Sequence, residues 1–319
     1  MRASLRIRGS LVIIFCLLLI VGCSNQVGSM NENEQARITV TDHADREVKF
    51  AEPPKRIVSL VQGDMDILYQ LGAEIVGGPT VSKDLLPTEL ANIEQVGTAH
   101  EADFEKIVSL KPDLIIGHAG LNMKDISTVE SLGLKMFLTN SNSYESILEV
   151  IDQYGKILER ENEAKEMIAE IEAKKKEIEQ KPLTKDVRAL IIYGTTDLFL
   201  AALPTSLSGD LLATVGGENV ASDLPGIESY PDYAQLSMER VIEANPDVIY
   251  FITHGEPEAV KEKFESELKS NPSWKKIKAL ENDNFVLLPY ELFGTNPGPK
   301  LAESLTYIRE NLESIAAEN

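Results

Sequence analysis

ENEAKEMIAEIEAKKKEIEQK, residues Glu161–Lys181, is the stretch from which the organisation of the chain can be inferred. It contains no glycine or proline and is dense in Ala, Glu and Lys, which are strong helix formers. Its apolar residues recur near helical spacing, at Ala164, Met167, Ile168, Ile171 and Ile178. This pattern predicts a long helix with one narrow buried stripe, able to join two lobes rigidly. Taken alone, it also fits a solvated helix on the surface of one domain.

Residues 1–22 have the pattern of a secretory signal peptide. Three arginines precede an apolar run from Leu11 to Val21, which is too short to span a bilayer comfortably. The run ends at Gly22 and Cys23 and resembles a bacterial lipobox, which implies cleavage before Cys23 and lipid on its thiol. Residues 23–36 then form a flexible, lipid-anchored tether. A plain signal peptide or a buried cysteine is the alternative.

The composition excludes several classes of function. The chain has a net charge of −20, which argues against nucleic-acid binding, because that affinity comes from cationic contacts. Its other cysteine, Cys16, leaves with the signal peptide, so no thiol remains for a disulfide, a thiolate metal site or a nucleophile.

Short apolar strands alternate with amphipathic helices in the first half of the chain. A hairpin is expected over 38–50, and the apolar strands that follow occupy 56–60, 75–78, 114–117 and 135–138. Strands that alternate with helices in this way predict a largely parallel sheet.

The same pattern restarts after the long helix. The strand at 187–193 resembles 56–60, and a Pro-Asp step precedes an apolar strand at 112–113 and again at 246–247. The repeat predicts an α/β fold with two Rossmann-like lobes, one long rigid helix and a ligand cleft between the lobes. The predicted bounds are 37–158 for the N-terminal lobe, 159–182 for the connecting helix and 183–319 for the C-terminal lobe. One continuous doubly wound sheet is the alternative.

Four stretches have residues in common with one known family: Arg56–Leu60, Asp66–Gly72, Phe104–Ile116 and Leu236–Phe251. They resemble the class III substrate-binding proteins of ABC importers, which take up siderophores, cobalamin and haem. The resemblance implies a monomeric binding protein, not an enzyme, whose partners are a permease dimer and its ATPase. With the lipid anchor, it implies a location at the outer face of the cytoplasmic membrane in a Gram-positive type of bacterium.

Within that family the chain is most similar to the haem-binding lipoproteins of Gram-positive haem uptake systems. The residues that carry this resemblance are Thr253–Glu258, Ser270–Trp274 and Phe293–Asn296. In that group a Met from the first helix and a His from the second lobe hold the haem iron, which implies Met65 and His254.

The predicted positions of both ligands agree with this role. Haem iron accepts thioether and imidazole, and ligands of α/β proteins gather beyond the carboxyl ends of strands. Met65 lies at a strand-to-helix junction and His254 follows an apolar strand. His100 is the substitute iron ligand in the first lobe.

Other residues have weaker assignments. Lys83, Tyr193 and Phe293 are expected to contact the ligand, and His118 to line the cleft. His43 lies in the hairpin region and is expected to be structural.

Two functions compete with haem binding. A ferric siderophore or a corrinoid could occupy the same fold, but an anionic siderophore would want more cations than the cleft loops offer. A tethered α/β hydrolase is a distant alternative, since the sequence has no Gly-x-Ser-x-Gly, phosphate-loop or His-Glu-x-x-His motif.

Acidic residues are also expected to dock the protein on its permease. The resemblance places Asp66 and Glu239 at matching points of the two halves, where each would pair with permease arginines, with Glu105 as the substitute in the first lobe. Solvated acids that favour a helix N-terminus are the alternative.

Overall fold

The computed structural model describes residues 36–81, 86, 88–194, 198–236, 238–253, 259–260, 262–264, 266 and 276–318. Contacts group Arg37–Asn319 into one unit. The predicted signal peptide and the lipidation site Cys23 lie outside the described residues. Among the helices that are described, none has the length and apolar character needed to cross a membrane.

The predicted N-terminal hairpin is confirmed. Strands β1 (Ile38–Thr41) and β2 (Glu47–Phe50) pair antiparallel, with Ile38 opposite Phe50. The buried Asp42 carboxylate accepts the backbone N–H groups of Ala44 and Arg46, both at 3.0 Å, and so fixes the connecting turn.

The first lobe contains the parallel sheet that the strand pattern predicts. Its order is β5-β4-β3-β6-β7, and every neighbouring pair is parallel. The strands are β3 (Arg56–Ser59), β4 (Glu74–Gly78), β5 (Glu94–Gln95), β6 (Leu114–His118) and β7 (Met136–Thr139). The helical elements are α2 (Gln62–Gln70), η3 (Thr88–Leu90), α3 (Phe104–Ser109), α4 (Ala119–Asn122), η4 (Met123–Asp125) and α5 (Ile126–Ser131).

The second lobe repeats this plan with a modified edge. Its order is β11-β9-β8-β12-β13, with β10 also paired to β8. Strand β12 is parallel to β8 and β13, whereas β9 is antiparallel to both β8 and β11. The strands are β8 (Arg188–Gly194), β9 (Phe199–Ala202), β10 (Glu218–Asn219), β11 (Tyr233–Gln235), β12 (Val248–Ile252) and β13 (Phe285–Leu287). The helical elements are α8 (Leu207–Thr214), α9 (Met238–Ala244), α11 (Lys278–Glu281), α12 (Tyr290–Phe293), η6 (Gly298–Lys300) and α13 (Leu301–Glu318).

The two lobes repeat individual interactions as well as elements. Asp113 accepts the backbone N–H of Arg56 at 3.0 Å, and Asp247 accepts that of Arg188 at 2.9 Å. These are the aspartates of the two Pro-Asp steps. The first helix of each lobe, α2 or α8, is followed by a glycine with positive φ, Gly72 at 83° and Gly216 at 90°. A left-handed glycine ends both helices because other residues adopt this conformation at a cost.

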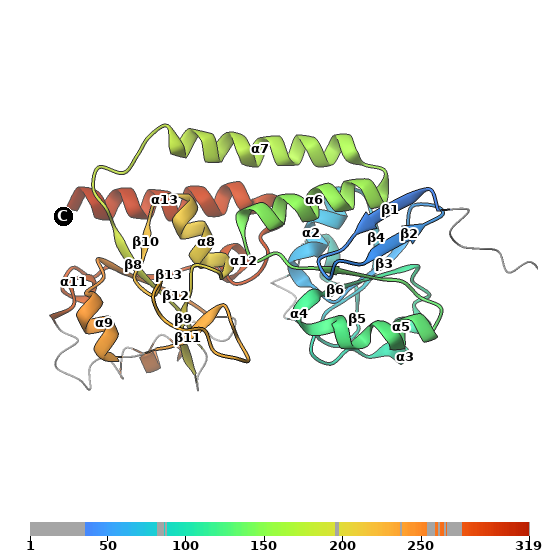
Figure 1. Ribbon diagram of the computed structural model, residues 1–319, viewed down its shortest axis with the longest axis horizontal. Helices are drawn as coiled ribbons and strands as arrows, with labels where there is room; N and C mark the ends of the chain where they lie inside the picture. Colours follow the sequence, from blue (N-terminus) through green and yellow to red (C-terminus); the bar gives the residue numbers. More distant parts are fainter. Residues whose placement is uncertain are drawn as a thin grey trace, which may run out of the picture. The chain divides into compact units, whose positions relative to one another are not determined.

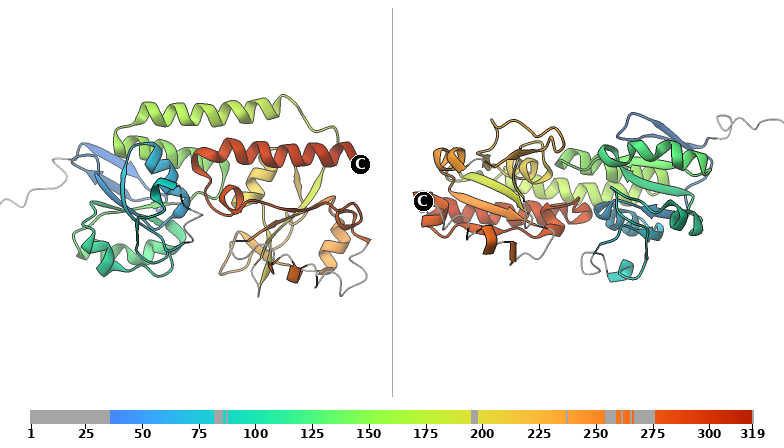
Figure 2. Two further views of the ribbon diagram at one scale, coloured as in Figure 1. Left: turned by 180° about the vertical axis from the view of Figure 1, so that it is seen from behind. Right: turned by 90° about the horizontal axis from the view of Figure 1, so that it is seen from below.

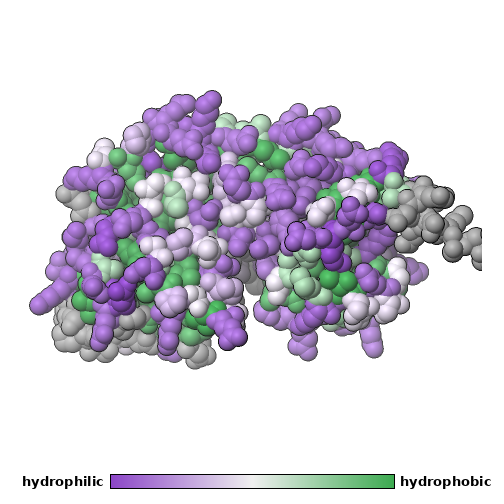
Figure 3. Space-filling model, viewed as in Figure 1, coloured by the Kyte–Doolittle hydropathy of each residue, from purple (hydrophilic) through white to green (hydrophobic). Residues whose placement is uncertain are grey.

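The long helix predicted at 161–181 is α7 (Glu161–Glu179), and it follows α6 (Tyr144–Leu158) directly. Glu159, with φ of 54°, reverses the chain between them. The predicted stripe buries Ala164, Ile171 and Ile178, while the Glu side chains of α7 are exposed. Helix α7 packs against both α6 and α13, and it lies alongside them in Figures 1 and 2. Figure 3 shows hydrophilic side chains along its outer side.

Direct hydrogen bonds also join the lobes. The Asp210 carboxylate of α8 accepts the backbone N–H of Tyr144, the first residue of α6, at 2.7 Å. The Asn296 amide, which precedes η6, donates to the buried Asp64 carboxylate of α2 at 2.8 Å. A Cβ on Gly63 would lie 2.2 Å from the carbonyl oxygen of Asn296, so glycine is required for this approach. Residues 296–300 therefore belong to the second lobe by sequence but contact the first.

Candidate functional site

Met65 lies in the first turn of α2, as predicted, but its side chain has no exposed surface. Its sulfur packs toward the end of β4, where a Cβ on Gly78 would lie only 3.1 Å from it. The structure thus places this thioether in the hydrophobic core, at the carboxyl edge of the sheet. To bind iron, the side chain would have to turn out of that packing.

His100 is exposed in the turn between β5 and α3. The turn is closed by two backbone hydrogen bonds, from Thr98 N–H to Glu101 at 2.9 Å and from Glu101 N–H to Thr98 at 3.1 Å. Within the described part of the chain, the ring nitrogens of His100 make no hydrogen bond. His100 is therefore the histidine of the first lobe whose imidazole can accept a metal without breaking existing contacts.

His118 ends β6 and caps α4. Its Nδ1 accepts the Gly120 backbone N–H at 3.1 Å, so in the neutral ring the proton is on Nε2. Burial lowers the pKa of His118, although Asp64 and Asp232 oppose this effect. The Nδ1 contact disfavours iron binding through Nε2, which would need the other tautomer.

His43 has the structural role expected of it. Its Nδ1 lies 2.8 Å from the Asn140 backbone N–H and so ties the hairpin region to the residue after β7.

The second lobe presents tyrosines at the corresponding edge. Tyr193 of β8 lies 5.6 Å, between ring centroids, from Tyr233 of β11, and its hydroxyl is hydrogen-bonded to Tyr290. Burial raises the pKa of Tyr193 above its ordinary value and raises that of Tyr233 to about 12. Both hydroxyls are therefore protonated at neutral pH, and the two rings pack against each other.

Phe293, which was predicted to contact the ligand, is buried in this structure. The side chain is 2% exposed, and its ring packs 5.8 Å, between centroids, from Tyr307 of α13. The ring belongs to the core between α12 and α13. His254 and Lys83, the remaining predicted ligand contacts, lie outside the described residues.

The two predicted docking acids do not occupy matching points. Asp66 lies in α2, where it accepts a hydrogen bond from Gln70, and its counterpart in the second lobe is Asp210 of α8. Glu239 is the second residue of α9, and its counterpart is Glu105, the second residue of α3. Both glutamates are exposed. Glu105, the predicted substitute for Asp66, and Glu239 are therefore the two acids that occupy equivalent positions in the two lobes.

Two buried polar residues of this region were not predicted. Asp64 accepts hydrogen bonds from Thr139, Tyr154 and Asn296, and Asn122 links β6 to the turn that holds His100. Neither lies in a recognisable motif. The feature of the sequence that could have indicated them is a polar residue in an otherwise apolar segment where a strand leads into a helix.

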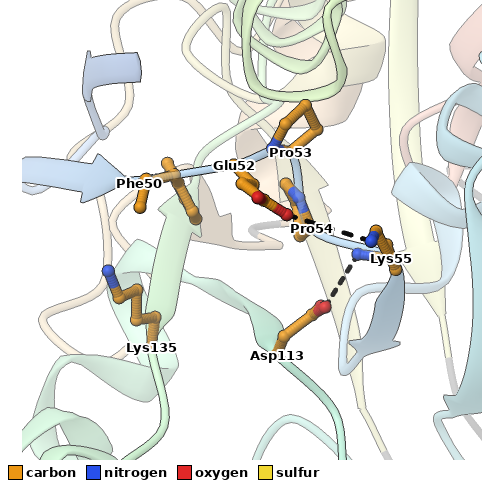
Figure 4. A pocket seen from close by; sticks show the side chains of 8 residues that line it. Phe50, Glu52, Pro53, Pro54, Lys55, Asp113 and Lys135 are labelled. Carbon is orange, nitrogen blue, oxygen red and sulfur yellow. Dashed lines mark hydrogen bonds and ion pairs between the residues drawn. The ribbon is translucent and has the colours of Figure 1, made fainter. Parts of the chain in front are cut away.

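A pocket of about 380 Å³ lies at the opposite, amino edge of the first sheet (Figure 4). It is lined by Phe50, Ala51, Glu52, Pro53, Pro54, Lys55, Asp113 and Lys135. Two of its charged side chains bond nearby backbone groups: Asp113 accepts the Lys55 backbone N–H at 2.8 Å, and Lys135 donates to the Lys49 carbonyl at 2.5 Å. It is separate from the candidate site.

Among the described residues, no three His, Cys, Asp or Glu side chains converge in a way that could hold a metal ion. Two α/β lobes bridged by long helices, with histidine and tyrosines at the carboxyl ends of strands, define a two-lobed binding protein. A family model described as Periplasmic binding protein matches residues 57–292, and the chain belongs to this family.

Individual relatives agree with this assignment. The chain is 29% identical over 243 residues to the High-affinity heme uptake system protein IsdE of Staphylococcus aureus (strain bovine RF122 / ET3-1), which covers 76% of this chain and 81% of the relative.

Two solved structures are also similar. The S. aureus IsdE structure complexed with heme has a TM-score of 0.71 at 28% identity and covers 81% of this chain and 98% of that one. An ABC transporter substrate-binding protein from Listeria monocytogenes EGD-e has a TM-score of 0.70 at 28% identity, with 82% and 99% covered. The chain is thus a substrate-binding component of an ABC importer, which implies a permease and an ATPase as partners.

Proposed function

We propose that this protein captures haem and delivers it to the permease of its importer. The observation that carries the proposal is the exposed His100 imidazole at the carboxyl edge of the first sheet, together with the aromatic rings of Tyr193 and Tyr233 in the second lobe. Iron porphyrin needs an axial donor and a flat apolar contact, and this pair supplies both. The haem named for the IsdE relative and its structure adds support.

The axial ligands that we propose are His100 from the first lobe and His254 from the second. His254 directly follows Thr253, at the end of β12. Met65 remains the alternative in the first lobe, at the cost of leaving its core packing. Lys83 is proposed to contact the haem propionates and Tyr193 the ring edge.

Visible spectra of the purified mature protein with added haemin test the proposal. His100→Ala and His254→Ala should each lose or shift the Soret band. Met65→Leu, a swap of similar volume that costs under about 1.5 kcal/mol in a core, should leave it unchanged. A shift only in the Met65 variant would restore Met65 and remove His100 from the site.

A wild-type protein without any haem spectrum would overturn haem binding in favour of a ferric siderophore or a corrinoid, which titrations with those ligands would identify. Hydrolysis of a model ester or phosphate ester would instead support the distant hydrolase alternative.

Two further parts of the proposal concern the membrane. Cys23 is proposed to carry the lipid that holds the protein at the outer face of the cytoplasmic membrane. Glu105 and Glu239 are proposed to dock on permease arginines, because two separated carboxylates can meet a two-fold permease at two points and fix orientation as well as attraction.

A further inference from the structure

Asn122 is a fully buried polar side chain at the carboxyl edge of the first sheet. Its Oδ1 accepts the His118 backbone N–H at 2.9 Å. Its Nδ2 donates to the carbonyl oxygen of Ala99 at 2.8 Å and to the Asp125 carboxylate at 2.9 Å. The amide oxygen and both amide hydrogens are therefore used. A buried amide satisfied in this way holds the segments that it touches in one arrangement.

The backbone of β6 is shaped to admit this side chain. A Cβ on Gly117 would lie 3.0 Å from Asn122 Cβ and 3.2 Å from its Oδ1. These distances are tighter than ordinary van der Waals contact, so glycine allows the amide to lie against the strand. Asn122 is thus held against β6 on one side, and its amide bonds the turn on the other.

The segment that it reaches is the turn that carries His100. Ala99, whose carbonyl Asn122 holds, directly precedes His100, and Lys124 Nζ donates to the carbonyl of His100 itself at 3.1 Å. The base of the turn is anchored separately, by the Thr80 N–H to the Gly97 carbonyl at 2.6 Å. Two consecutive carbonyls of an otherwise exposed turn are therefore tied to α4 and η4.

We infer that Asn122 is a positioning residue for His100: it holds the turn so that the backbone that carries the imidazole is already ordered when the ligand arrives. The inference rests on the proposed role of His100 as an iron ligand. Its physical basis is entropic, because ordering an exposed turn on binding would subtract from the affinity, and prior ordering avoids that cost. The effect should lie mainly in the dissociation rate of haem.

The test compares Asn122→Ala with a matched control, Asn219→Ala. Asn219 is also buried and makes similar bonds, to the Ala202 carbonyl at 2.9 Å and from the Ala221 N–H at 2.9 Å. It pairs with the amino end of β8, away from the candidate site. We expect haem to transfer to excess apomyoglobin about tenfold faster from Asn122→Ala than from wild type, and at an unchanged rate from Asn219→Ala. Equal acceleration in both variants would overturn the inference, because it would show general destabilisation.

A double-mutant cycle that combines Asn122→Ala with His100→Ala shows whether Asn122 affects haem transfer through His100 or independently of it. In that background the additional Asn122→Ala change should not accelerate transfer further; a further tenfold increase would refute the link to His100. Lys124→Met, at an exposed residue, should accelerate transfer in the same direction by a smaller factor.

Amide hydrogen exchange of residues 98–102 in the ligand-free protein provides a readout that needs no haem. Faster exchange in Asn122→Ala than in Asn219→Ala is expected, and equal protection would overturn the inference. If wild-type protein binds no haem, the proposed function fails, while this exchange comparison still decides whether Asn122 orders the turn.

Discussion

Replacing Tyr154 by Phe should destabilise the protein, whereas the same replacement at Tyr250 should not. Both tyrosines are completely buried. The Tyr154 hydroxyl donates to the Asp64 carboxylate at 2.6 Å, while the Tyr250 hydroxyl has no hydrogen-bond partner among the residues that the structure describes. Because both changes remove one buried hydroxyl from a tyrosine ring, their difference isolates the hydrogen bond.

The expected magnitude follows from the surroundings of Asp64. Its carboxylate accepts Thr139 at 2.7 Å and Asn296 at 2.8 Å in addition to Tyr154. A hydrogen bond to a charged group contributes about 1.5–3 kcal/mol, and Thr139 continues to satisfy the shared oxygen after Tyr154 is changed. We therefore expect Tyr154→Phe to lower the free energy of unfolding by about 1.5–3 kcal/mol. Tyr250→Phe removes an unsatisfied hydroxyl and should leave stability unchanged or slightly raise it.

Urea unfolding of the protein without its signal peptide, followed by circular dichroism at neutral pH, measures both values. The denaturant dependence should be the same in both variants, which would show that the same surface is exposed on unfolding. Equal losses of stability at the two sites would refute the reasoning, because the bond to Asp64 would then contribute nothing.

Three shorter predictions concern the anchor, the docking acids and pH. Cys23→Ala should release the protein into the medium, because the lipid on Cys23 is expected to be its only attachment to the membrane. A variant that stays with the membrane fraction would contradict the interpretation of this segment as a lipobox. Glu105→Ala combined with Glu239→Ala should abolish uptake while haem binding persists; normal uptake would remove their docking role. Burial raises the pKa of Asp210 above its ordinary 3.8, so the folded state binds its proton more tightly than the unfolded state. Its contribution to stability should therefore be present below pH 3.8 and decline as pH rises through the raised pKa; Asp210→Asn should lack that decline, as urea midpoints at several pH values would show.

The sequence predicted the fold well where local composition decides the structure. Helix α7 follows from a run of strong helix formers with one apolar stripe, and the strands of the first sheet follow from apolar runs between glycines and prolines. The antiparallel strands β9 and β11 were not predicted, because their pairing depends on partners along the sheet rather than on their own residues.

The site was predicted less well, because the sequence does not show in which direction each side chain points. Met65 and His100 both lie near strand ends, but only packing decides that the first side chain points into the core and the second outward. Asp66 resembled Glu239 because acidic residues begin many helices, and only the order of elements shows which helices correspond. Asn122 gave no periodic signal, since its importance comes from contacts with residues distant in sequence.

Burial of polar groups at Asp64 and Asn122 has a common consequence for binding. Removing such groups from water is costly, so their net contribution to stability is smaller than the cost of breaking one of their hydrogen bonds, and a further effect is to select one arrangement. Asp64 selects the contact between α2 and Asn296 of the second lobe, and Asn122 selects the position of the turn around His100. A receptor ordered in this way before binding gains affinity through slow release rather than fast capture. Substitutions at either position should consequently alter haem release far more than haem association.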